Sequence, residues 1–368
     1  MRRAAPFVLA LALFAAALGR DGFDRWVDTT VLPPLVVETS VEMLDRNGTL
    51  LRAYTVADGR WRLDVSLDGV DPRYLDMLIA YEDKRFYRHH GVDPVAMLRA
   101  VGQALRNGRI ISGGSTLTMQ VARLLENGPT GEWHGKLRQL RVALALERHL
   151  TKQQILALYV NRAPFGGNLE GVRAATFAYF GKEPRRLTPA EAALMVALPQ
   201  SPERRRPDRY HGAAHDARDR VLARMVGDRV LTDDTRRAAM TEPVPDRRID
   251  FPRLAAHLTD RLRSEGPSAQ IHRLTLEAAL QARLETLAER AAHEAGRRQS
   301  IAIMVADHTT GEILASVGSA GYADDDREGF VDMTRAMRSP GSTLKPLIYG
   351  LAFDRGLAHP ETLIEDRP

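Results

Sequence analysis

One short charged segment carries the residue types that proton transfer needs. Residues 82–93 read Glu-Asp-Lys-Arg-Phe-Tyr-Arg-His-His-Gly-Val-Asp and follow an apolar helical stretch. Leu75, Leu78 and Ile79 precede Glu82 by seven, four and three residues, so helical spacing puts all four on one face. A carboxylate at the end of an apolar stripe loses solvation, which suits it to proton transfer. The alternative is a surface charge cluster that ends a helix.

A second polar segment joins a glycine turn to the start of a helix. Residues 113–123 read Gly-Gly-Ser-Thr-Leu-Thr-Met-Gln-Val-Ala-Arg. Backbone amides and hydroxyls at such a helix start are suited to hold phosphate or sugar oxygens. Gln120 and Arg123, three residues apart, would share a face of this helix. The alternative is that Ser115 simply caps the helix.

Cations gather at the start of the next predicted helix. Lys136, Arg138 and Arg141 flank an apolar stripe that begins at Leu137. A solvated cationic face is the usual meaning of this pattern. The cations would hold a pyrophosphate only if the stripe packs beside Glu82.

The last part of the chain changes character. Two apolar runs, 301–306 and 313–317, are joined by a turn at 308–311 and predict a β-hairpin that opens an α/β domain. Further on, Ser342 and Lys345 lie three residues apart at a predicted helix start. On one helix face, a desolvated lysine can assist a nucleophilic serine.

Composition limits the classes of protein. The chain has 368 residues, enough for two domains, and its 52 Lys and Arg against 47 Asp and Glu give a net charge of +5. This balance suits anionic partners such as phosphates or an acidic membrane surface. The absence of cysteine excludes disulfides and thiolate metal sites. The histidines show no metal-ligand spacing, since the neighbours His89 and His90 point in different directions.

The N-terminus predicts export. Arg2 and Arg3 precede an unbroken apolar run over residues 4–19, which Arg20 closes. These 16 residues fall short of the roughly 20 that span a bilayer, although snorkelling arginines extend the reach. Basic residues before the run favour a single-pass anchor of the cytoplasmic membrane with the catalytic part outside the cytoplasm. The alternative is a signal peptide cleaved near residues 15–17.

Turn and helix signals divide the remainder. Asp45 to Gly48 reads as a hairpin turn between strands at 41–44 and 49–56, and residues 72–198 read as helical nearly throughout. Thr188 to Glu191 fits a capping box. The predicted parts are an anchor, a connector, a helical domain, a linker and an α/β segment, over residues 1–20, 21–44, 45–225, 226–298 and 299–368 respectively.

With these segments in hand, the chain resembles the class A penicillin-binding proteins, which build peptidoglycan. The segments that carry the resemblance to their family 51 glycosyltransferase domain are 82–93, 114–123, 136–161 and 174–202. Residues 161–167 and 335–345 resemble the 1C branch. The resemblance implies a mostly α, lysozyme-like glycosyltransferase domain after the membrane anchor, then the α/β start of a serine transpeptidase domain. It also implies that lipid II, a disaccharide-pentapeptide on a polyprenyl pyrophosphate, is polymerised into glycan strands.

The resemblance assigns roles to individual residues. Glu82 matches the catalytic base, Lys136 a cation near the leaving pyrophosphate, Ser342 the acyl-ester nucleophile and Lys345 its partner. Positions that match the lining of the substrate groove are Asp83, Phe86, His90, Gly91, Ser115, Thr116, Thr118 and Gln120. Arg123, Arg138 and Gln139 complete the set of predicted substrate-binding residues.

The chain departs from the family pattern at two places. The family commonly has a second glutamate at the position of Gln139, so we expect Glu82 to act alone as base, with Lys136 and Arg138 stabilising the leaving group. The 68 residues from 301 onward are too few to bury a transpeptidase core, and no Ser-x-Asn or Lys-Thr-Gly element follows Lys345. We therefore expect an incomplete, inactive transpeptidase half.

Two rival functions remain. One is a glycan-cleaving lysozyme-like enzyme and the other is a non-catalytic cell-wall scaffold. No cofactor is required by the sequence, although a divalent cation could help to hold pyrophosphate. The expected partners are lipid II, the nascent glycan strand, the cytoplasmic membrane and other cell-wall synthesis proteins, with no nucleic acid.

Overall fold

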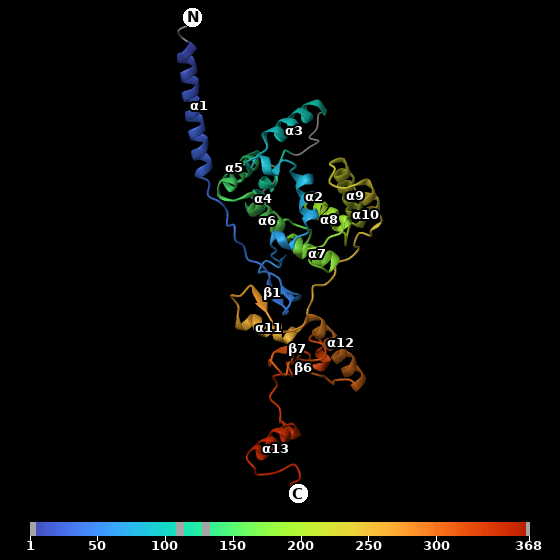
Figure 1. Cartoon of the computed structure of the whole chain (residues 1–368). Helices are drawn as coiled ribbons and strands as arrows, with labels where there is room; N and C mark the ends of the chain where they lie inside the picture. Colours follow the sequence, from blue (N-terminus) through green and yellow to red (C-terminus); the bar gives the residue numbers. More distant parts are fainter. Residues whose placement is uncertain (1–4, 108–113, 127–132, 366–368) are drawn as a thin grey trace. The chain divides into compact units, whose positions relative to one another are not determined.

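The computed structural model describes residues 5–107, 114–126 and 133–365 (Figure 1). Contacts divide the chain into two compact units. Unit 1 contains residues up to Leu44, Gly48–Arg253 and Gly266–Leu274. Unit 2 contains Asp45–Asn47, Leu254–Glu265 and the chain from Thr275 onward.

Unit 1 is mostly helical, as the sequence predicts. Its α-helices are α1 (Ala5–Asp28), α2 (Pro72–Glu82), α3 (Pro94–Asn107), α4 (Leu117–Glu126), α5 (Trp133–His149), α6 (Lys152–Arg162), α7 (Val172–Phe180), α8 (Pro189–Ala197), α9 (His211–Gly227) and α10 (Asp233–Thr241). The 3-10 helices η1 (Leu67–Gly69), η2 (Phe86–Arg88) and η3 (Leu198–Gln200) complete them.

Short strands interrupt the helices. β1 (Val41–Leu44) pairs antiparallel with β2 (Leu50–Tyr54), which confirms the predicted hairpin, and parallel with β5 (Ile271–Arg273). β3 (Trp61–Arg62) pairs parallel with β4 (Leu169–Glu170), so the predicted helical region contains one short strand.

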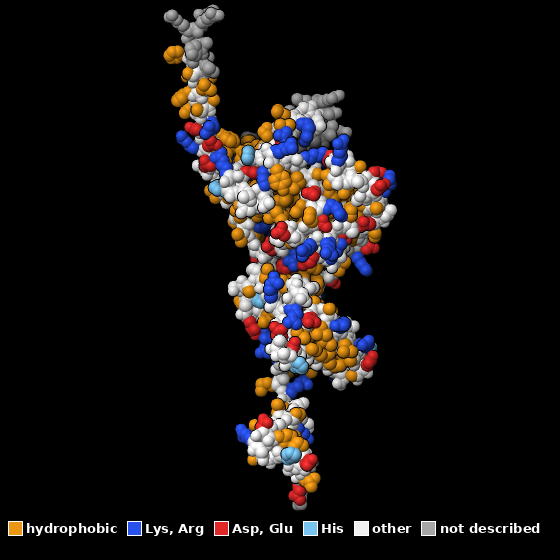
Figure 2. All heavy atoms as spheres, viewed as in Figure 1, with side chains coloured by type: hydrophobic (Ala, Val, Ile, Leu, Met, Phe, Trp, Pro, Cys, Tyr) orange, Lys and Arg blue, Asp and Glu red, His pale blue; other side chains and the backbone are white. Residues whose placement is uncertain are grey.

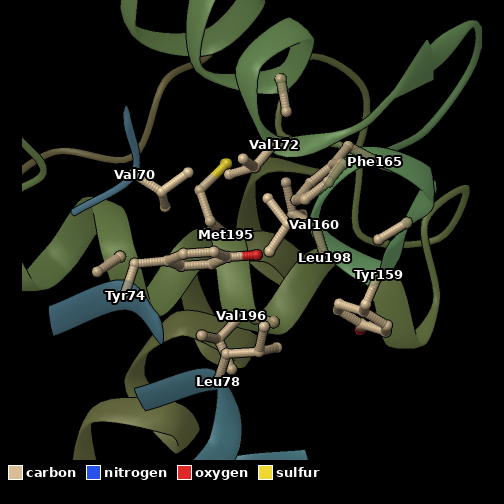
Figure 3. Close-up of a cluster of buried hydrophobic side chains, with 14 of the residues drawn as sticks. Val70, Tyr74, Leu78, Tyr159, Val160, Phe165, Val172, Met195, Val196 and Leu198 are labelled. Carbon is tan, nitrogen blue, oxygen red and sulfur yellow. The ribbon is translucent and has the colours of Figure 1, made fainter. Parts of the chain in front are cut away.

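The core of unit 1 forms where α2 meets α8. Tyr74, Met77 and Leu78 of α2 are fully buried. In Figure 3, Tyr74 and Leu78 lie among side chains that include Met195 and Val196 of α8. Each fully buried apolar side chain contributes roughly 1.5–3 kcal/mol relative to exposure. This packing fixes the C-terminal end of α2, where Glu82 lies.

Local capping signals agree with the structure. Asp71 caps α2 by accepting from the Arg73 amide, and Pro72 occupies the first turn. Thr188 and Glu191 form the predicted capping box of α8. Local sequence therefore sets where each of these two packed helices begins.

The N-terminal helix differs in length from the prediction. α1 continues through Asp28, eight residues beyond the predicted anchor over residues 1–20, so part of the expected connector is helical. Large apolar side chains such as Phe7, Leu11 and Phe14 are well exposed along it, and charged side chains gather toward its C-terminal end (Figure 2). Within the described residues, none of the helices combines the length and apolar character needed to cross a membrane.

Unit 2 contains α11 (Ala256–Glu265), α12 (Ala278–Ala295), β6 (Ile303–Ala306), β7 (Ile313–Val317), η4 (Asp325–Arg327), η5 (Gly341–Leu344) and α13 (Lys345–Asp354). β6 and β7 form the predicted antiparallel hairpin. Ala288 and Ala292 of α12 pack with Val317 in a small core. Gln281 ties α12 to β7, because its side chain exchanges two hydrogen bonds with the Ser316 backbone over 2.8 and 2.9 Å.

Candidate active site

Glu82 is the last residue of α2, and both of its carboxylate oxygens accept hydrogen bonds. The side-chain amide of Gln120, from α4, donates to Oε2 over 2.9 Å. The side-chain amide of Gln200, from η3, donates to Oε1 over 3.0 Å. Among the described residues, no cation lies within ion-pair distance of Glu82. Within the described part of the chain, the carboxylate is therefore held by neutral donors.

A cleft of about 570 Å³ opens beside this carboxylate. It brings together five of the sequence-predicted site residues, Glu82, Asp83, Ser115, Thr116 and Gln120. The rest of its lining is Tyr81, Lys84, Arg85, Asp93, Ala96, Arg99, Gln103, Gly114, Gln200 and Arg224. A cleft of this size can admit part of a sugar substrate.

Asp83 organises the cleft wall. Its buried carboxylate accepts from the Leu117 amide over 3.0 Å and from His89 over 2.9 Å. It thus joins the end of α2 to the start of α4, as an acidic group at a helix N-terminus does favourably. The contact comes from His89, whereas His90 is exposed and only bridges to Val92.

The start of α4 is capped by Thr116. The sequence indicated Ser115 as the alternative cap. The Thr116 hydroxyl accepts from the Met119 amide over 3.1 Å and donates to the carbonyl of Gly91. Ser115 remains exposed at the cleft. This frees the Ser115 hydroxyl to meet a substrate.

Gly91 lies against the backbone of α5. Its φ is +87°, and a Cβ there would come within 2.7 Å of the Ala143 carbonyl oxygen. Only glycine fits such a conformation and contact without strain. In the structure, this predicted groove residue therefore acts through packing.

Two further predicted residues are buried. Phe86 is fully buried, and the Lys152 ammonium lies 4.5 Å from its ring centroid. Thr118 is also fully buried and donates to Glu147 over 2.6 Å. Lys152 donates to the same Glu147 oxygen over 2.6 Å, so these residues connect α4, α5 and α6.

The predicted cations of α5 are not among the described residues that line the cleft. Lys136 and Arg138 are exposed, and Arg138 pairs with Glu126 over 2.6 Å. Arg123 of α4 and Gln139 of α5 are half-buried, and neither lines the cleft as described. Their roles in substrate binding stay predictions.

The cleft has cations of its own. Lys84 pairs with Asp228, and Arg85 lies 3.4 Å from Asp93. Arg224 stacks over Tyr81, with its guanidinium carbon 4.5 Å from the ring centroid. Arg99 of α3 is exposed, and among the described residues it has no ion-pair partner.

Two buried tyrosines lie near Glu82. Burial, reinforced by the negative charge of Glu82, raises the pKa of Tyr74 and of Tyr159. These phenols are thus neutral across the physiological range. Within the described part of the chain, no cluster of three His, Asp or Glu side chains could hold a metal ion.

Comparisons with known proteins identify the family of this chain. Residues 47–226 match the transglycosylase family, and residues 301–368 match the penicillin-binding protein transpeptidase domain. The chain is 46% identical over 365 residues to penicillin-binding protein 1C of Escherichia coli, covering 99% of this chain and 46% of that protein. This chain belongs to the class A penicillin-binding proteins.

Other relatives are more distant. Penicillin-binding protein 1A of Escherichia coli is 33% identical, covering 70% of this chain and 31% of the relative. Penicillin-binding protein 1F of Bacillus subtilis is 28% identical, covering 90% and 48% respectively. The chain thus spans less than half the length of each of these relatives. A crystal structure of penicillin-binding protein 1A from Haemophilus influenzae aligns with a TM-score of 0.34 at 20% identity, covering 72% of this chain and 30% of that one.

The transpeptidase-matched segment of this penicillin-binding protein contains the Ser-Lys pair. Ser342 lies in η5, and Lys345 begins α13, which follows directly. Both residues are exposed. Their roles as nucleophile and partner stay predictions.

Sequence reasoning missed three residues that contact the site. Gln200 binds Glu82, His89 binds Asp83, and Arg99 lines the cleft. The sequence assigns no individual role to Gln200. The signal available was its membership of the 174–202 motif, but no spacing rule relates residue 200 to residue 82.

Proposed function

We propose that this chain is a peptidoglycan glycosyltransferase, which polymerises lipid II into glycan strands with release of polyprenyl pyrophosphate. The observation that carries the proposal is Glu82, a carboxylate held by two neutral amide donors at the edge of a polar cleft. Such a group can accept a proton, because no cation competes for its lone pairs within the described residues.

In the proposed reaction, Glu82 removes the proton from the acceptor sugar's 4-hydroxyl. The oxygen then attacks C1 of the donor sugar, and the bond from C1 to the pyrophosphate oxygen breaks. Binding both sugars in one cleft would supply the proximity and orientation that this step requires. The Tyr81 and Ser115 side chains at the cleft are suited to hydrogen-bond sugar hydroxyls.

A leaving pyrophosphate needs positive charge. Arg99 is the cleft cation whose charge no described residue neutralises, and it is our leading candidate for this contact. Lys136 and Arg138 would contribute if the substrate extends along α5. A divalent ion could supplement them.

We further propose that α1 attaches the protein to the cytoplasmic membrane, with the catalytic part on the outer side. Support comes from the arginines that precede the run and from the exposed apolar side chains of Phe7, Leu11, Leu13, Phe14 and Leu18. A lipid substrate is reached most readily by an enzyme held at the same surface. Extraction of membranes with carbonate and with detergent, with and without residues 1–20, tests this attachment.

Glycan cleavage is less well supported by the site. Carboxylate-based glycosidases use two carboxyl groups, one on each side of the scissile bond. The other acids of the cleft are already engaged: Asp83 by His89 and the Leu117 amide, and Asp93 by Arg85 and the start of α3. Glu82 is thus the one carboxylate poised for catalysis among the described cleft residues.

The test is to incubate the purified chain in detergent with labelled lipid II and to analyse the products. A transferase yields a lysozyme-sensitive polymer together with free polyprenyl pyrophosphate. A hydrolase would instead shorten preformed glycan strands. Binding of lipid II with neither product would support the non-catalytic scaffold.

A further inference from the structure

A line of hydrogen bonds reaches Glu82 from a segment more than 100 residues away in sequence. Gln200 ends η3, and its amide nitrogen donates to Glu82 Oε1 over 3.0 Å. Behind it, Nη1 of Arg205 donates to Gln200 Oε1 over 3.0 Å. The same Arg205 nitrogen donates to the Ala197 carbonyl over 2.7 Å.

The chemistry of the line permits one orientation of the Gln200 amide. A guanidinium can only donate hydrogen bonds, and a carboxylate can only accept them. The amide oxygen must therefore face Arg205, and the amide nitrogen must face Glu82. Without Arg205, the amide could rotate by half a turn and present its oxygen to Glu82, which would repel it.

Arg205 is well suited to hold this orientation. Burial lowers the pKa of its guanidinium, which still remains charged at neutral pH. Its contact with the Ala197 carbonyl ties it to the C-terminal end of α8, where a cation is stabilised by the helix dipole. The donor behind Gln200 is thus fixed to the same helix that packs against α2.

Glu82 faces other groups that bear on its charge. Gln120 of α4 donates to its second oxygen, and Tyr74 of α2 and Tyr159 of α6 feel its field. The charged groups that line the cleft with it are Asp83, Lys84, Arg85, Asp93, Arg99 and Arg224. Among these described groups, the two carboxamides donate hydrogen bonds directly to its oxygens.

We propose that Gln200 and Arg205 are positioning residues for Glu82. Arg205 orients the Gln200 amide, and that amide holds the Glu82 carboxylate in the orientation in which it accepts the proton of the acceptor hydroxyl. The inference rests on the proposed glycosyltransferase function. It assigns a role to two residues that the motif-based prediction left unused.

The first test is the pH dependence of polymer formation by the full chain. Gln200→Leu removes the donor, so we expect about a tenfold lower rate and an acid limb that moves up by roughly half to one pH unit. Arg205→Met should move the acid limb in the same direction, but by less. Arg204→Met alters the adjacent exposed arginine and should leave the profile unchanged.

A double variant shows whether Arg205 and Gln200 act through one line of hydrogen bonds or independently. Because Arg205 acts through Gln200, combining Arg205→Met with Gln200→Leu should cost no more than Gln200→Leu alone. Arg205→Lys, which keeps a donor, should restore part of the activity. Additive losses, or an unchanged pH profile in folded Gln200→Leu, would overturn the proposal; thermal melting identifies variants that fail to fold.

A measurement that needs no catalysis tests this inference separately from the proposed function. Carbon-13 labelling of glutamate carboxyls, with Glu82→Gln to assign the signal, follows the titration of Glu82 directly. A higher midpoint in Gln200→Leu and Arg205→Met supports the line even if wild type forms no polymer. An identical midpoint in all variants contradicts it even if wild type is active.

Discussion

At the scale of single residues, the site depends on how one carboxylate is held. Glu82 accepts from Gln120 and Gln200, which carry no charge. A cation in either place would stabilise the ionised carboxylate strongly and reduce its ability to take a proton. Neutral amides orient Glu82 without placing a cation beside it. Our proposal that Glu82 acts alone as base is consistent with Gln139 in place of a second acid.

Arg99 offers a test of charge in the cleft. Arg99→Ala should raise the KM for lipid II about tenfold and lower kcat less, because a charge-assisted phosphate contact is lost mainly in binding. Steady-state polymerisation over a range of lipid II concentrations measures both constants. Arg88→Ala, at an exposed arginine outside the cleft lining, is the matched control. Equal KM values for wild type and Arg99→Ala would contradict a contact between Arg99 and the pyrophosphate.

The sequence predicted the position of Glu82 at the end of a helix, but it did not predict the residues that surround Glu82. Glu82 could be found because an apolar stripe with helical spacing ends at it. Its contact with Gln200 could not be found, since it joins residues 118 positions apart in sequence. Contacts of this kind depend on how α8 packs on α2, which local pattern does not determine.

At the scale of elements, the loop after α2 is fixed by its contact with α5. Gly91→Ala should destabilise unit 1 by roughly 2 kcal/mol or more, because the positive φ and the Ala143 carbonyl both exclude a Cβ. Urea unfolding followed by circular dichroism measures the loss. Gly102→Ala in α3, where an added Cβ meets no atom within 4 Å, should be neutral or stabilising. Equal stability of Gly91→Ala and wild type would show that the loop is not held in this way.

The junction of β3 and β4 contains a buried charge cluster. Glu170 accepts from Arg62 over 2.7 and 2.8 Å, and Arg60 and Arg162 also contact it. Burial alone would raise the pKa of Glu170, but the hydrogen bonds and charge of Arg62 outweigh burial and hold the pKa below its ordinary value. The carboxylate thus stabilises the fold above the unfolded-state pKa, and this stabilisation is lost as pH falls through the lower folded-state pKa.

Glu170→Gln should therefore cost about 2–4 kcal/mol at pH 7, because it leaves buried guanidinium groups without their anion. The difference from wild type should shrink as pH falls below about 4.5, the ordinary value for glutamate. Denaturant unfolding at several pH values follows this change. Glu38→Gln, at an exposed carboxylate that lines one pocket together with Glu170, should have little effect. A pH-independent difference would contradict the ion-pair explanation.

Element boundaries were predictable wherever a local signal sets them. The Asp45–Gly48 turn and the Thr188 capping box are written in short segments and appear as expected. The cap of α4 was not predictable, because both Ser115 and Thr116 are good caps and the choice depends on a bond from Thr116 to Gly91. The end of α1 was also missed, since amphipathic residues such as Trp26 continue the helix beyond the apolar run.

At the scale of the molecule, unit 1 contains everything that the proposed chemistry uses. Its core joins α2, α4 and α8, which supply Glu82, Gln120 and, through η3, Gln200. Helices packed on a common core keep such a constellation within the tight tolerances that catalysis needs. The order of the motifs in the sequence predicted this helical domain. The sequence could not predict whether the α5 cations line the cleft, because that depends on how the helices pack.

The most direct test compares wild type with Glu82→Gln for both lipid II binding and polymer formation, in detergent and at neutral pH. We expect the variant to bind labelled lipid II within a few-fold of wild type but to form polymer at least about 100-fold more slowly. Asp76→Asn, an exposed acid on the same helix, should match wild type. Near-normal polymer formation by Glu82→Gln would contradict the assignment of Glu82 as the base.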